Sequence, residues 1–509
     1  MNELTGKRIL IFQQRGWAIN IGHFLAKKLQ GEGCRLAALT LKKTTHEFIL
    51  NQKEVKYDLV INNDEIMSRP KDYLRGDSYS LKEICNALDI DTIWPIIMTL
   101  RNHVKSYKDK YYYGFKQNVP DEEIIDFVMA VYKYINKIFD KFNPEFIIAP
   151  NFVALPHIMF NLFAKKRGIS MIAVTDSKVR GYYIFSHHYQ DGKGDFFDHV
   201  DELNNGRAET KNRQRAKEYI KEFRKKFIQS EFLIKLKINK EKKTLIETIR
   251  HELSPYKLIL RWYIKGPSKN FLESTGITID YKPPKIILRD HYCHKRYKKF
   301  MDSFNYYPFE KIKKFVYFPL QFQPEASMDV AAPYFGNQIE TARLVAMSMP
   351  DDYVLAVKEH PAMVGFRPPS YIEKVARTPN VKLIDYRISN EEVLKKTDLV
   401  VSPNSTTIAE AAFLNKLAIQ LGDLGTTLKL PNVFKHTDMT TLSAKIKDVL
   451  KVNLKTEEYE RRLENFVAAV YDTGFDFQYM TVWEKGKGDN IDNLWQIYRK
   501  EIKKVLGLI

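Results

Sequence analysis

The chain has 509 residues, 44% of them hydrophobic and 13% aromatic, which is too long for one core and predicts two α/β domains with additions. The formal net charge is +19, and the three cysteines, Cys34, Cys85 and Cys293, are far apart and odd in number. The number and spacing of the cysteines argue against a disulfide framework and against a metal site. They favour a protein of the reducing cytoplasm over a secreted one. The apolar run near the N-terminus, Ile9 to Phe12, is too short for a signal peptide or a membrane span.

The first part of the chain has the pattern of an α/β domain. Short apolar runs at Lys7 to Phe12, Leu36 to Thr40 and Asp58 to Asn62 predict strands. The loop Gln13 to His23 follows the first of them, and a helical pattern then ends at Gly31 or Gly33.

An acidic residue follows another buried run in this domain. Met171 to Val174 predicts a strand, and Asp176 comes directly after it, with Arg180 in the same loop. A carboxylate in this place could deprotonate an acceptor hydroxyl or stabilise developing positive charge, or it could simply cap a turn. Asn151 and His157 lie at the two ends of the loop that follows the preceding predicted strand, and they are candidates of the same kind.

The composition changes after Asn205. Between Arg207 and Phe300 there are 26 Lys and Arg against 10 Asp and Glu, a net of +16 out of the total of +19. Helical periodicity is visible over Arg215 to Ile238, and Leu258 to Gly266 mixes basic and aromatic residues. Such an insertion suits an anionic membrane face, a polyanionic glycan or a solvated helical surface. We expect no nucleic acid, because no known binding motif accompanies the charge.

A second α/β domain begins near residue 306. The runs Val354 to Val357, Val381 to Ile384 and Leu399 to Val401 are short and rich in β-branched residues, and a further strand is predicted within Lys314 to Leu320. Each run ends in a loop and is followed by a helical pattern, which is typical of a doubly wound parallel sheet. Because ligands of such sheets bind at the carboxyl ends of the strands, the loops there are the candidate site.

Two of these loops carry groups that suit a phosphate. Ser402 to Thr407 leads into a helix with Ser405 or Thr406 as N-cap, so it combines hydroxyls, backbone N–H groups and the positive end of a helix dipole. His360 adds an imidazole that could donate a hydrogen bond or become cationic, and Pro361 ends the strand beside it. The alternative is that the turn only caps a helix and the His-Pro pair has no function.

Three motifs, in this order, resemble the capsule polysaccharide biosynthesis family, which includes the bacterial Kdo transferases of capsule assembly. They are Tyr317 to Ser327 with its Gln-Pro-Glu-Ala, the Lys-Glu-His-Pro of Lys358 to Pro361, and Ser402 to Asp423. The third motif has Ser-Pro-Asn-Ser-Thr where family members often carry a Thr-Gly-Thr-like turn. The resemblance implies an α/β fold of GT-B type, in which two Rossmann-like domains face a cleft, with a basic helical insertion and C-terminal helices added here.

The resemblance also implies the roles of individual residues. A nucleotide-sugar donor would be bound as co-substrate, without a further cofactor, by Gln323, Lys358, His360, Pro361, Ser402, Asn404, Ser405, Thr406 and Glu410. Similar sialyltransferases, which hold a CMP-sugar phosphate with a His-Pro and a serine-rich turn, make CMP the favoured nucleotide. His23, with Arg15 and Gly16, is a candidate in the first loop of the N-terminal domain, although it could merely start a helix. Glu325 could lie beside the ribose or the reacting sugar, or could cap a helix.

The resemblance thus implies a GT-B glycosyltransferase. We expect it to be metal-independent, because no Asp-x-Asp motif follows a strand in the proper context. Asp176, His23 and Glu325 are its candidate catalytic residues. The expected partners are a nucleotide-sugar donor, a glycan or glycolipid acceptor and the anionic inner face of the cell membrane, where we expect peripheral association. A polyol-phosphate transferase, a sugar-nucleotide epimerase and a non-catalytic glycan-binding scaffold are the alternatives.

The expected domain boundaries follow these changes in pattern. Residues 1–205 form the N-terminal Rossmann-like acceptor domain and 206–305 the basic insertion. Residues 306–480 form the nucleotide-sugar domain, and 481–509 a C-terminal helix that packs back on the first domain.

Overall fold

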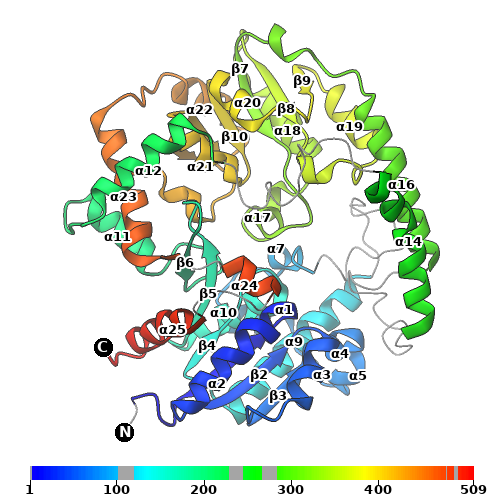
Figure 1. Ribbon diagram of the computed structural model, residues 1–509, viewed down its shortest axis with the longest axis vertical. Helices are drawn as coiled ribbons and strands as arrows, with labels where there is room; N and C mark the ends of the chain where they lie inside the picture. Colours follow the sequence, from blue (N-terminus) through cyan, green and yellow to red (C-terminus); the bar gives the residue numbers. More distant parts are fainter. Residues whose placement is uncertain (1–2, 101–119, 229–244, 266–283, 477–478, 486–490) are drawn as a thin grey trace. The chain divides into compact units, whose positions relative to one another are not determined.

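The computed structural model describes residues 3–100, 120–228, 245–265, 284–476, 479–485 and 491–509 (Figure 1). Contacts divide the chain into two compact units. The first unit comprises the described residues within 1–100, 119–199 and 470–509, and the second unit comprises the described residues within 200–469. We describe each unit by itself.

The first unit is built on a seven-stranded sheet with the order β13-β6-β5-β4-β1-β2-β3. Strands β1 to β5 are parallel to one another, whereas β6 and β13 add an antiparallel edge beyond β5. The strands are β1 (Arg8–Gln13), β2 (Arg35–Thr40), β3 (Leu59–Asn62), β4 (Phe146–Ile148), β5 (Ser170–Asp176), β6 (Tyr182–Ser186) and β13 (Phe475–Asp476). Their side chains are mostly buried, because helices cover both faces of the sheet.

Alternate residues of β1 point to the two faces and so define two apolar layers. Ile9 and Ile11 belong to the core beneath α2, α24 and α25, whereas Phe12 packs on Phe160 of α10, with ring centroids 5.1 Å apart. The helices of this unit are α1 (Arg15–Trp17), the π-helix η1 (Ala18–Gly22), α2 (His23–Gly31), α3 (Lys43–Asn51), α4 (Asn63–Ser68), α5 (Pro70–Leu74), α6 (Leu81–Leu88), α7 (Trp94–Ile97), α9 (Asp121–Lys141), α10 (Leu155–Lys166), α24 (Tyr479–Lys485) and α25 (Ile491–Val505).

The end of the chain packs on the first unit. Tyr479 of α24 accepts a hydrogen bond through its hydroxyl from Trp17 Nε1 at 2.8 Å, and the ring of Tyr498 of α25 lies 5.0 Å from that of Phe185. Tyr498 is fully buried in the same core. The C-terminal helices are therefore part of the hydrophobic core of this unit.

The second unit contains a six-stranded, wholly parallel sheet with the order β12-β11-β10-β7-β8-β9. The strands are β7 (Phe315–Pro319), β8 (Val354–Lys358), β9 (Val381–Ile384), β10 (Leu399–Ser402), β11 (Leu417–Gln420) and β12 (Val433–Lys435). The helices around it are η3 (Phe309–Lys311), α17 (Ala326–Asp329), η4 (Pro333–Phe335), α18 (Gln338–Met347), η5 (Pro361–Met363), α19 (Pro369–Ala376), α20 (Asn390–Lys396), α21 (Thr406–Phe413), η6 (Thr426–Lys429) and α22 (Leu442–Val449). Helices α11 (Asp195–Asn204) and α23 (Glu457–Thr473) continue across the boundaries between the units.

The basic segment contributes α12 (Arg213–Lys225), α14 (Leu245–Lys265) and α16 (Pro284–Asp302) to the second unit. Phe223 of α12 packs on Phe413 of α21, with ring centroids 4.8 Å apart, and α14 and α16 lie side by side (Figure 1). The helical prediction for residues 229–238 lies outside the described residues. Within the described ranges, no helix has the length and apolar character needed to cross a membrane.

The predicted fold class is confirmed: the chain is α/β and has two Rossmann-like parallel-sheet domains, the domain content of the GT-B class. The predicted strands of both sheets form within one or two residues of the expected bounds.

Candidate functional site

The sheet of the second unit has one point at which the direction of winding reverses. The chain passes from β7 to β8 and β9 on one side, and then returns to place β10, β11 and β12 on the other side of β7. At such a point the loops that leave two neighbouring strands diverge and open a crevice, which is where open α/β sheets bind ligands. The loops after β7 and β10 lie at this position, and the loop after β8 adjoins them.

The turn after β10 is held in place by side-chain hydrogen bonds. Ser405 is the N-cap of α21, and its Oγ accepts from the backbone N–H of Thr407 at 3.1 Å. Asn404 Nδ2 donates to the carbonyl of Leu424 at 3.1 Å, which ties the turn to the loop after β11. Gly425 has φ +110°, and a Cβ there would lie 2.7 Å from Asn404 Nδ2, so glycine is required beside the turn.

The loop after β7 is joined to this turn and to α18. Buried Ser402 accepts from Gln321 Nε2 at 3.3 Å, and Gln338 exchanges two hydrogen bonds with the backbone of Gln321, at 2.6 and 3.2 Å. Gln323 accepts from Gln338 Nε2 at 3.1 Å and donates to Asp329 Oδ1 at 3.2 Å. Gln323 therefore shapes the loop from inside, because both ends of its amide bond to protein groups.

His360 is presented as a neutral hydrogen-bond donor. Its Nδ1 accepts from the backbone N–H of Ala362 at 3.2 Å, so the ring proton is on Nε2. Burial, followed by the charges of Arg367 and Lys358, lowers the pKa of His360 to about 3. Pro361 begins the short helix η5 directly after it. The imidazole is thus uncharged at neutral pH, unlike the cationic form that the sequence left open.

Lys358 lies deeper than His360. It is 4% exposed, and its Nζ donates to the carbonyl of Ile388 at 2.9 Å. Burial lowers the pKa of Lys358 to about 8, with Glu410 and Glu392 acting in the opposite direction. Its charge therefore lies behind the strand-end loops and can be lost within the physiological range of pH.

Glu410 belongs to the same inner layer. It is 3% exposed on α21 and accepts from Asn390 Nδ2 at 2.5 Å, and Asn390 Oδ1 in turn accepts from the hydroxyl of Tyr317 at 3.0 Å. This network joins α21, α20 and β7 beneath the loops. Glu410 is therefore placed to support the site rather than to be exposed at its surface.

A buried ion pair that the sequence did not predict connects the loops after β7 and β8. Arg367 and Glu359 are each 1% exposed, and Arg367 Nη1 lies 2.8 and 3.0 Å from the two carboxylate oxygens. Arg367 Nη2 also donates to the carbonyl of Gln321 at 2.6 Å, and Glu359 accepts from the backbone N–H of His360 at 2.6 Å. The pair therefore positions the residue that precedes His360 and the loop that carries Gln323.

Glu325 is the N-cap of the short helix α17. Its Oε2 accepts from the backbone N–H of Ser327 at 3.2 Å and also bonds the Ser327 hydroxyl. The side chain is exposed at the end of the loop after β7. The geometry shows the capping role, and the catalytic role of Glu325 stays a prediction.

The other two catalytic candidates belong to the first unit. Asp176 ends β5, is exposed, and accepts from the backbone N–H and Nζ of Lys178 at 3.1 and 3.0 Å, as in a turn cap. Although partial desolvation acts to raise its pKa, Lys178 and Arg180 keep the pKa below its usual value. His23 begins α2, and its Nε2 lies 2.8 Å from Glu54 Oε2. Both residues thus have structural partners, and their catalytic roles remain untested.

Buried polar groups also gather at the carboxyl ends of β1 and β4, where the winding of the first sheet reverses. In the described part of the chain, Gln13 Oε1, Asn151 Oδ1 and His157 Nε2 have no hydrogen-bond partner. Gly22 lies close to Gln13, since a Cβ there would lie 2.2 Å from Gln13 Oε1. Gly22 is therefore required by packing at this edge.

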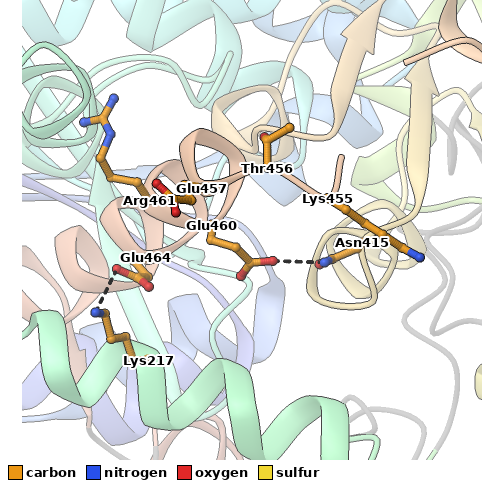
Figure 2. A pocket seen from close by; sticks show the side chains of 8 residues that line it. All are labelled: Lys217, Asn415, Lys455, Thr456, Glu457, Glu460, Arg461 and Glu464. Carbon is orange, nitrogen blue, oxygen red and sulfur yellow. Dashed lines mark hydrogen bonds and ion pairs between the residues drawn. The ribbon is translucent and has the colours of Figure 1, made fainter. Parts of the chain in front are cut away.

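A surface hollow of about 530 Å³ lies elsewhere in the second unit (Figure 2). Its lining consists of Lys217 of α12, Asn415, and Lys455, Thr456, Glu457, Glu460, Arg461 and Glu464 in and before α23. Glu460 accepts from Asn415 Nδ2 at 2.9 Å, and Lys217 lies 4.0 Å from Glu464. Because Lys217, Glu460, Arg461 and Glu464 are already paired and the hollow lies away from the carboxyl ends of the strands, we do not take it as the functional site. Among the described residues, no three His, Cys, Asp or Glu side chains are placed to hold a metal ion.

No protein-family model and no curated protein sequence matches the chain. Solved structures that resemble it include the MnaA–UDP complex of S. aureus, with 12% identity, a TM-score of 0.26, and 99% of this chain and 98% of that chain covered. Two others are KpsC structures from Thermosulfurimonas dismutans, a β-Kdo 2,7 transferase (11% identity, TM-score 0.34, 73% and 90% covered) and a β-Kdo 2,4 transferase (13%, 0.35, 70% and 87%). Because these TM-scores are below 0.5, we base the function on the geometry of the strand-end loops.

The Glu359–Arg367 pair gives a test of this geometry. Replacing Arg367 by Met should lower the free energy of unfolding by about 3–5 kcal/mol, because it leaves Glu359 as an uncompensated buried charge. The matched control is Arg387→Met, since Arg387 pairs with Asp385 at 2.6 Å but is 56% exposed. That change should cost less than about 1 kcal/mol. Urea unfolding of the two variants measures the difference, and equal losses would contradict the structural role of the buried pair.

Proposed function

We propose that the chain is a glycosyltransferase that moves a sugar from a nucleotide-sugar donor to a lipid-linked or growing surface polysaccharide. The single observation that supports this most strongly is that the Ser405-capped turn and the neutral His360 follow β10 and β8, the strands on either side of β7, next to the winding reversal of one sheet. A CMP-sugar such as CMP-Kdo is the favoured donor, in keeping with the resemblance of the three motifs to the capsule polysaccharide family.

The donor phosphates would bind at the start of α21. First-turn N–H groups there have no partner within the helix, and together with the Ser405 and Thr406 hydroxyls and the helix dipole they favour an anion. His360 would donate from Nε2 to a second oxygen, and Lys358 would add positive potential from behind. These groups would stabilise the charge that develops on the leaving nucleotide, without requiring a metal ion.

The acceptor would be bound and activated by residues of the first unit. Asp176, and after it His23, are the residues we propose for deprotonating the acceptor hydroxyl, with Glu325 beside the reacting sugar. Because Lys178 and Arg180 keep the pKa of Asp176 low, this carboxylate is ionised at neutral pH and can accept a proton or face a developing cation. We place the reaction at the cytoplasmic face of the membrane, with the basic insertion as the contact.

The alternatives make different products. An epimerase of this fold class would need catalytic carboxylates in the second unit, but Glu359 there is bound to Arg367 and Glu410 to Asn390. Product analysis with a labelled nucleotide sugar separates the cases. A transferase yields a lengthened glycan and nucleotide, a polyol-phosphate transferase a glycan with a polyol phosphate, an epimerase a rearranged nucleotide sugar, and a scaffold no product.

Nucleotide binding should depend on His360. In calorimetric titrations with CMP, UDP, GDP and CDP, one nucleotide should bind tightly, and His360→Ala should weaken it at least about tenfold, or about 1.4 kcal/mol. His251→Ala is the control, because His251 lies on the exposed helix α14 of the same unit. If no nucleotide binds, the proposed transferase is ruled out and the non-catalytic glycan-binding scaffold is favoured.

The binding should also depend on pH through Lys358. Below a pKa of about 8 the side chain is protonated and attracts the phosphate, whereas above it the charge is lost. Affinity should therefore fall as the pH rises from about 7 to about 9, by up to about tenfold if only the protonated form binds. The ligand's own phosphate is already ionised over this range. Lys358→Met should bind more weakly at pH 7 and show a flat profile, and an unchanged slope in this variant would refute the assignment.

A further inference from the structure

Helix α14 carries a row of large apolar side chains that the structure leaves exposed. Leu245, Ile249, Leu253, Tyr256, Leu260 and Tyr263 follow one another every three or four residues, and each is between 50% and 77% exposed. With 3.6 residues per turn, this spacing places them along one side of the helix. We call these six residues the α14 strip. Ile246 and Ile264 widen it at its two ends and are 63% and 74% exposed.

The side of α14 next to the strip packs on α16 within the chain. Glu252 lies 2.9 Å from Lys295 and 3.5 Å from His291 of α16, the hydroxyls of Tyr256 and Tyr292 lie 3.2 Å apart, and Pro255 is buried. Figure 1 shows the two helices side by side at the outer edge of the second unit. A helix that packs on a neighbour along one side and leaves an adjoining apolar row exposed has a surface for a further, external partner.

The charges around the strip favour an anionic partner. Within the described parts of α14 and α16, residues 245–265 and 284–302, there are ten Lys and Arg against four Asp and Glu, a net of +6. Arg250 and Lys257 lie next to the strip by helical spacing, and both are exposed. A second copy of the chain docked through the same strip would bring these like charges together, which disfavours a homodimer.

We propose that the α14 strip lies in the interfacial region of an anionic lipid bilayer, with Arg250 and Lys257 on the headgroups. The combination of aliphatic side chains, two tyrosines and flanking cations is what an interfacial helix presents to lipid. The helix would lie in the plane of the membrane surface, since it is not apolar all round. Its purpose, to bring the nucleotide site to a lipid-linked acceptor, rests on the proposed function, but the binding itself does not.

The test is vesicle sedimentation with the full chain. Wild-type protein should bind vesicles of mixed phosphatidylglycerol and phosphatidylcholine, and bind vesicles of phosphatidylcholine alone at least about tenfold more weakly. The double variant Leu253→Glu with Leu260→Glu should lose at least about tenfold in partition to the anionic vesicles. Leu258→Glu is the matched control, because Leu258 is 51% exposed on the same helix but lies away from the strip. It should bind like the wild type.

Two further measurements distinguish membrane binding from dimerisation and from a failure of the nucleotide site. Arg250→Gln with Lys257→Gln should weaken binding about fivefold for each charge removed and reduce its dependence on salt. Calorimetric nucleotide binding should be unchanged in all these variants, so a failure of the nucleotide site is recognised separately. Absence of wild-type binding to anionic vesicles would overturn the proposal, as would equal loss in Leu258→Glu. A wild-type dimer that Leu253→Glu with Leu260→Glu converts to a monomer would overturn it in favour of a second copy.

Discussion

The candidate site depends on the buried ion pair between Glu359 and Arg367. Two strand ends can present a ligand site only if their loops keep a fixed distance, and here one guanidinium bonds both the Glu359 carboxylate and the Gln321 carbonyl. A buried pair of this kind adds little net stability compared with apolar residues of similar size, because both ions lose their hydration. Its role is geometric, since Arg367 bonds the loop after β7 and Glu359 bonds the backbone of His360 in the loop after β8.

The electrostatics of the site follow from this dry interior. Burial makes His360 neutral and lowers the pKa of Lys358 to about 8, so the site holds less positive charge than its sequence suggests. The main attraction for a phosphate is then the set of oriented N–H groups at the start of α21, with the Nε2–H of His360 as a further donor. Oriented dipoles of this kind need no reorganisation when a charge develops, which is what stabilisation of a leaving group requires.

The sequence predicts those features of the fold that depend on neighbouring residues. β9 (Val381–Ile384) has the predicted bounds, and Ser405 is one of the two predicted caps, because β-branched runs and N-caps are local signals. Arg367 escapes prediction because its contact with Glu359 requires the intervening turn at Gly365, which has φ +87°. The charge state of His360 likewise depends on burial by distant segments. In the sequence, basic residues are interspersed with the apolar residues of α14, so the exposed row cannot be recognised. Only the packing of α16 against α14 shows which side of the helix remains exposed.

The measurement that tests the central claim most directly is hydrogen–deuterium exchange of the full chain with and without a saturating nucleotide. The account predicts slower exchange in peptides covering Gln321–Ser327 and Pro403–Ile408, the loops after β7 and β10, because bound phosphates would engage the amides at the start of α21. Protection confined to the first unit, or to the surface hollow beside α23, would contradict it, because the nucleotide would then bind away from the strand-end loops of the second sheet.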